Sequence, residues 1–120
     1  ANNLAWLITQ NGGNLDEALQ LSTASVAKNQ TVAGFYDTLG WVYLKKGLYS
    51  PAVEQLRKAI AIDERSGKPA TAGYRVRLAT ALAMAGDKAS ARREVETSLR
   101  SESELSQQEV VDAKKVLASL

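Results

Sequence analysis

The chain has 120 residues and a formal charge of +2, and it contains neither cysteine nor histidine. This length suits one domain, and the two missing residue types exclude disulfides, thiolate chemistry and histidine-based catalysis or metal binding. Apolar residues make up 45% of the chain, yet no apolar run reaches the roughly 18–20 residues of a membrane span. We therefore expect a globular domain without a membrane-spanning helix.

Residues 1–32 predict a helix, a tight turn and a second helix. Leu4, Ala5 and Ile8 lie at helical spacing. The pattern starts abruptly, so we interpret this stretch as a truncated first unit. Asn11-Gly12-Gly13-Asn14 is a strong turn signal. Asp16 and Glu17 follow it, and they are favourably placed near the positive start of the second helix.

Residues 33–66 show the same arrangement in full. One helical face is formed by Tyr36, Leu39, Gly40 and Tyr43. Gly47 then predicts the end of that helix, because glycine readily adopts the backbone that a helix stop needs. A second apolar face follows at Tyr49, Ala52, Leu56, Ala59 and Ile60. Pro51 is tolerated because it falls in the first turn of this second helix.

A constant interval connects the first two units. Gly13 and Gly47 are 34 residues apart, and so are Ala18 and Ala52. The next turn glycine, Gly86, follows Gly47 after 39 residues. Five extra residues therefore separate the units, and we place them at 67–71, where glycine and proline occur. The third unit then covers residues 72–105.

The last stretch, residues 106–120, predicts a single capping helix. Ser106 and Glu109 form a capping-box pattern that begins it. A stack of helical repeats needs a terminal helix with a polar outer face, and we assign Asp112, Lys114 and Lys115 to that face. The chain is thus expected to form seven helices.

The central unit resembles a tetratricopeptide repeat, a helix–turn–helix unit of about 34 residues. The matching residues are Leu39, Gly40, Tyr43, Gly47, Tyr49, Ala52, Leu56 and Ala59. The family often has a proline where Glu64 stands, which leaves the end of the second helix open. The resemblance implies an all-α, right-handed superhelix of antiparallel helix pairs. The stretches NNLAWL and DTLGWVYLKKGLY are also similar to bacterial repeat proteins linked to exopolysaccharide export. Because the first helix starts abruptly and the last one is a finished cap, we expect the C-terminal part of a bacterial repeat array.

In this family the first helix of each pair lines the inner, concave surface. The resemblance therefore implies a partner-binding surface formed by Asn2, Trp6, Asp37, Trp41, Leu44, Lys45, Arg77 and Thr80. Trp6 and Trp41 occupy matching positions, and exposed tryptophans bind partners well. Packing between neighbouring helices is the alternative role for both rings. Gly73 stands where the family's clamp for acidic chaperone tails has a basic residue, so that mode of binding is not expected.

We expect a scaffold that binds a partner peptide or protein segment. Two alternatives remain open. One is a structural module that terminates a longer repeat array and self-associates as a homodimer through the truncated N-terminal end, and the other is a regulatory arm of a larger enzyme. The compartment is also open.

The chain itself is not expected to be an enzyme or to hold a cofactor or a metal. Asp16 and Glu17 are adjacent and cannot face each other on a helix, and Gly12-Gly13 lacks the Lys-Ser/Thr of a phosphate loop. Ten basic against five acidic residues in 57–100 predict solvated helix faces rather than a nucleic-acid surface.

Overall fold

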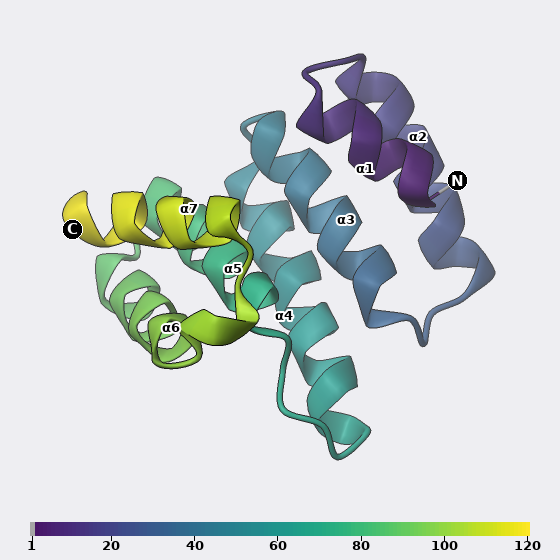
Figure 1. Ribbon diagram of the computed structural model, residues 1–120. Coiled ribbons are helices and arrows are strands. Elements are labelled where there is room, and N and C mark those ends of the chain that lie inside the picture. Colours follow the sequence, from purple (N-terminus) through teal and green to yellow (C-terminus); the bar gives the residue numbers. More distant parts are fainter. Residues whose placement is uncertain (1) are drawn as a thin grey trace.

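The computed structural model describes residues 2–120. All regular secondary structure within this range is helical, and it contains no strand. Ala1, with which the first predicted unit begins, lies outside the described residues. The all-α prediction is confirmed for residues 2–120, which form α1 (Asn2–Gln10), α2 (Leu15–Lys28), α3 (Ala33–Lys45), α4 (Tyr49–Arg65), α5 (Ala72–Met84), α6 (Lys88–Arg100), the short 3-10 helix η1 (Glu102–Glu104) and α7 (Gln107–Ala118) (Figure 1). None of these helices is both long and apolar enough to cross a membrane.

Two of the tight turns between helices depend on glycine. Gly47 follows α3 with φ +80°, and Gly86 follows α5 with φ +93°, a region that residues with a side chain rarely adopt. At the first turn the Leu48 N–H donates to the Tyr43 carbonyl at 2.9 Å, and at the second the Asp87 N–H donates to the Leu82 carbonyl at 2.9 Å. These are the bonds of a Schellman motif, and each folds the next helix back on its predecessor.

The helices pack as neighbouring pairs, and both helices of each pair also contact the element that follows the pair. α1 packs on α2, α3 on α4 and α5 on α6. In addition α1 contacts α3, α3 contacts α5, and α5 contacts α7, so these four helices follow one another along one side of the molecule (Figure 1). Residues distant in sequence can therefore meet on that side.

Glycine and alanine allow the helices to approach closely. A Cβ atom on Gly40 of α3 would lie only 2.7 Å from Cγ of Leu56 and 3.2 Å from the carbonyl oxygen of Ala52, both in α4. Leu56 and Ala52 are fully buried. Gly40 therefore allows α3 and α4 to approach closely, and this contact fixes the packing of the central pair.

The last helix begins with the predicted capping box. The Ser106 Oγ accepts from the Glu109 N–H at 3.1 Å, and the Ser106 N–H donates to Glu109 Oε1 at 2.9 Å. Further along α7, Ala113 and Val116 are buried against a cluster that includes Val76 and Val95. The apolar face of α7 therefore covers the end of the third helix pair.

Candidate functional site

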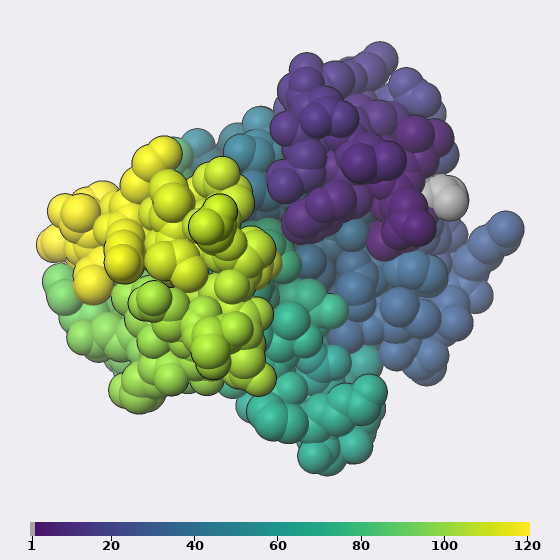
Figure 2. Space-filling view, in the orientation of Figure 1, coloured from purple at the N-terminus to yellow at the C-terminus, as the bar shows by residue number. Residues whose placement is uncertain are grey.

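A hollow of about 440 Å³ lies between the first and last helices of the chain. In Figure 2 it separates the purple helix α1 from the yellow helix α7, with α3 and α5 behind it. Its sides are formed by Trp6 and Gln10 of α1, Trp41 and Lys45 of α3, and Arg77 and Thr80 of α5. The facing side is formed by α7 with its N-cap, chiefly through Gln108, Glu109, Asp112 and Lys115. We call this hollow the central groove.

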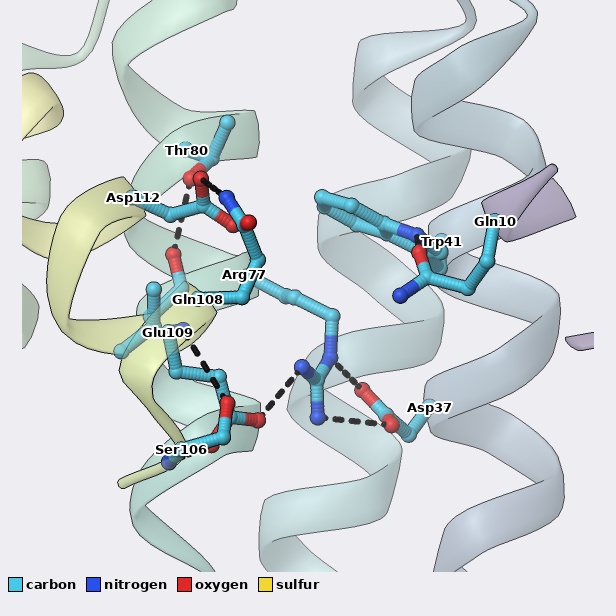
Figure 3. A network of polar contacts seen from close by, with 10 residues as sticks. Gln10, Asp37, Trp41, Arg77, Thr80, Ser106, Gln108, Glu109 and Asp112 are labelled. Carbon is cyan, nitrogen blue, oxygen red and sulfur yellow. Dashed lines mark hydrogen bonds and ion pairs between the residues drawn. The ribbon is translucent and has the colours of Figure 1, made fainter. Parts of the chain in front are cut away.

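Arg77 lies at the floor of the central groove and joins three helices (Figure 3). Its Nε donates to Asp37 Oδ1 at 2.6 Å and its Nη2 to Asp37 Oδ2 at 3.0 Å, which is a bidentate pair between α5 and α3. Its Nη1 donates to Glu109 Oε2 of α7 at 2.8 Å. Only 8% of Arg77 is exposed, so these charge-assisted bonds form away from water.

Two tryptophan rings lie beside the guanidinium group. The Cζ atom of Arg77 is 5.0 Å from the centre of the Trp6 ring and 6.0 Å from that of Trp41. Lys45 lies over the Trp41 ring at 4.6 Å. Cations at these distances are attracted by the negative face of the ring. Trp6 of α1 is thereby tied to α5, although α1 and α5 belong to different helix pairs.

Gly73 makes room for the contact between Arg77 and Glu109. A Cβ atom on Gly73 would lie 2.2 Å from Glu109 Oε2 and 3.0 Å from Nη2 of Arg77. No side chain fits at this position while the carboxylate stays in place. The glycine is therefore explained by the packing of α7 against α5.

The carboxyl groups on either side of Arg77 respond differently to their surroundings. Burial raises the pKa of Asp37 above its ordinary value, although the charge and hydrogen bonds of Arg77 act in the opposite direction. Burial also raises the pKa of Glu109, but hydrogen bonds from Ser106 and Arg77 outweigh it and bring that pKa below its ordinary value of 4.5. Because the chain's own carboxylates already occupy Arg77, this arginine is not open to a carboxylate of a partner.

Five of the eight residues expected on the partner-binding surface meet around the central groove: Trp6, Trp41, Lys45, Arg77 and Thr80. Asp37 lies below them, 5% exposed and paired with Arg77. Asn2 is half-buried and does not border the groove.

Leu44 differs from the expectation, because it is 8% exposed and belongs to the main core cluster with Leu56 and Leu82. Neither Leu44 nor Asp37 presents a surface to a partner.

Trp41 is chiefly a packing residue. It is 8% exposed and belongs to the same core cluster as Leu56. Its Nε1 donates to Oε1 of Gln10 in α1 at 2.9 Å, and little of the ring is left exposed to the groove. Trp6, in contrast, is half-buried and borders the groove. The two rings therefore differ in role although they occupy matching positions.

The residues that α7 contributes were missed from the sequence. Asp112 and Lys115 were expected on an outer polar face, but they border the central groove together with Gln108 and Glu109. One signal pointed to them: Gly73 stands in the first turn of α5, where glycine has no advantage for the helix itself.

Comparisons with known proteins found no family model that matches the chain and no significant match among curated proteins.

Proposed function

We propose that the chain is part of a right-handed superhelix of the tetratricopeptide type, and that it binds an extended segment of a partner protein in the central groove. The 34-residue interval between the first two units supports the repeat architecture. So does the contact of α1 with α3, of α3 with α5 and of α5 with α7, because stacked repeats bury their apolar faces against their neighbours.

The observation that carries the binding proposal is the central groove itself. Its volume of about 440 Å³ falls in the range of roughly 300–1,000 Å³ that ligand sites occupy. It combines a half-buried tryptophan, Trp6, with polar side chains on both walls. Aromatic anchors beside polar groups are typical of surfaces that bind proteins.

The test is selection of a random peptide library on the wild type and on a variant with a filled groove. Thr80→Phe places a ring where a half-buried threonine borders the groove. Thr23→Phe is the matched control, because Thr23 is exposed on α2, and both variants are first checked for helical content and melting temperature. We expect the wild type and Thr23→Phe to select the same consensus and Thr80→Phe to lose it. Equal selection by all three would show that the groove is not the site.

Self-association is the second candidate, and a specific observation favours it. Leu4 and Leu7 are 49% and 55% exposed and lie three residues apart on α1, hence on one face of that helix. Exposed apolar patches often mark sites of protein contact. Sedimentation of the wild type and of Leu7→Glu over a range of concentrations tests it: a dimer that the variant abolishes supports the candidate, and a wild type that stays monomeric contradicts it.

A further inference from the structure

Two glutamine side chains reach the central groove from opposite walls, and a neighbour fixes the orientation of each amide. On α1, Gln10 contacts Nε1 of Trp41 at 2.9 Å. The indole nitrogen can only donate, so the atom of Gln10 that faces it must be the oxygen. The Nε2 group of Gln10, with its two hydrogens, therefore points toward the groove (Figure 3).

On α7 the situation is reversed. Gln108 contacts Oδ1 of Asp112 at 2.9 Å, and an ionised carboxylate can only accept. The atom of Gln108 that faces Asp112 must therefore be Nε2. The carbonyl oxygen of Gln108 does not bond Asp112 and lies on the side of α7 that faces Trp41 and Gln10 (Figure 3). The groove thus has a hydrogen-bond donor on the α1 wall and an acceptor on the α7 wall.

We propose that this pair of amides binds the main chain of an extended peptide. In a trans peptide unit the C=O and the N–H point in opposite directions, so each peptide unit of an extended chain presents an acceptor to one side and a donor to the other. A carbonyl of the bound segment accepts from Gln10, and a nearby N–H donates to Gln108. This inference rests on the proposed function and names how that function recognises its partner.

Main-chain binding agrees with the rest of the groove. Arg77 is occupied by Asp37 and Glu109, so it does not select an acidic side chain. Trp6 is half-buried at the edge of the groove, and an indole ring packs against many kinds of side chain. The segment is therefore selected mainly for being extended, and the consensus found with a peptide library should be short and tolerant of substitution.

The test uses the peptide selected by the wild type, synthesised also as a series in which one backbone amide at a time becomes an ester. Each ester removes one N–H with little change of shape. We expect one ester in the series to weaken binding to the wild type about five- to tenfold, the usual effect of one hydrogen bond. The same ester should cause no further loss in Gln108→Met, because the acceptor for that N–H is already gone.

Each glutamine variant has a control in which an exposed glutamine outside the groove receives the same substitution. Gln10→Glu keeps an acceptor for Trp41 but removes the donor, and we expect it to weaken binding of the parent peptide about five- to tenfold. Gln20→Glu on α2 and Gln107→Met on α7 change exposed glutamines outside the groove, and both should bind as the wild type does.

The outcomes separate the two proposals. If every ester binds the wild type as the parent does, or if Gln10→Glu and Gln108→Met bind normally, main-chain recognition is wrong while groove binding remains. If the wild type selects no peptide at all, the proposed function fails, and this inference fails with it.

Discussion

Arg77 and Glu109 come within 2.8 Å of each other because residue 73 has no side chain. The glycine lies one turn before Arg77 on α5, and the Glu109 carboxylate occupies the space that a Cβ atom would fill. Glu109 at the same time closes the capping box with Ser106. One small residue on α5 therefore determines how the start of α7 is held.

The first prediction concerns Gly73→Ala. The new methyl group displaces the Glu109 carboxylate and removes its charge-assisted bond to Arg77, a loss of about 1.5–3 kcal/mol. The gain in helix propensity offsets at most about 1 kcal/mol. We expect a net loss of stability of about 1–2 kcal/mol, measured by urea unfolding.

Gly34→Ala is its matched control. Gly34 is the second residue of α3 as Gly73 is of α5, but a Cβ atom there would meet only the Tyr74 hydroxyl at 3.6 Å, an ordinary contact. This variant should gain about 0.4–1 kcal/mol. Equal gains in both variants would contradict the role assigned to Gly73.

Gly40→Ala is predicted to destabilise the central helix pair. Its Cβ atom would lie 2.7 Å from the branched Cγ of Leu56, which is fully buried and cannot move aside. Overpacking of this kind costs typically about 1–3 kcal/mol. In urea unfolding, the combination with Leu56→Ala should lose less than the sum of the single variants, because the shorter side chain relieves the clash. Strict additivity would show that the two residues do not interact.

Arg77→Met is predicted to cost about 3–5 kcal/mol, because it leaves the Asp37 carboxylate buried without its partner. Adding Asp37→Asn should recover part of that loss, since a neutral amide is less costly to bury than a carboxylate. Urea unfolding of the wild type, both single variants and the double variant gives the coupling energy. A double variant that is less stable than Arg77→Met alone would contradict this account.

The pH dependence of stability should contain a contribution from Glu109. Its pKa is lowered in the folded chain, so its contribution is fully present above the ordinary value of 4.5 and is lost as the pH falls through the folded value. Asp37 has a raised pKa and acts with the opposite sign: its contribution is present at low pH and is lost as the pH rises through the folded value.

Comparison with Glu109→Gln reports chiefly the first contribution, because Asp37 is retained in both proteins and the charge of Glu109 is the smallest of the influences on the pKa of Asp37. In urea unfolding we expect the stability difference between wild type and Glu109→Gln to be largest near neutral pH and to shrink as the pH falls below 4.5, through the lowered pKa of Glu109 in the folded chain. A difference that does not change with pH would mean that Glu109 is not ionised against Arg77.

Local patterns predicted the helices and several of their ends. Apolar spacing placed the helices, because the period of 3.6 residues is a property of the backbone alone. Glycine predicted the turns at Gly47 and Gly86, and the pattern of Ser106 and Glu109 predicted the start of α7. Each of these signals depends on residues close together in sequence.

Properties that depend on distant residues were not predicted. Leu44 was assigned to the partner-binding surface, yet α3 contacts α1, α2, α4 and α5, and a helix with neighbours on so many sides has little exposed surface. Asp112 and Lys115 were identified as polar and solvated, but a single sequence does not tell whether solvent on that side is bulk water or a groove. The pairing of Asp37 with Arg77, 40 residues later, has no local signal at all.

The contacts of Arg77 also bear on how the chain unfolds. In a simple repeat array each unit touches only its neighbours, so unfolding can begin at an end and spread one unit at a time. Here a single side chain joins Trp6 in the first unit, Asp37 in the second and Glu109 in the last helix. Fraying of either end therefore weakens the middle, and the molecule is expected to lose its structure in one cooperative step rather than unit by unit.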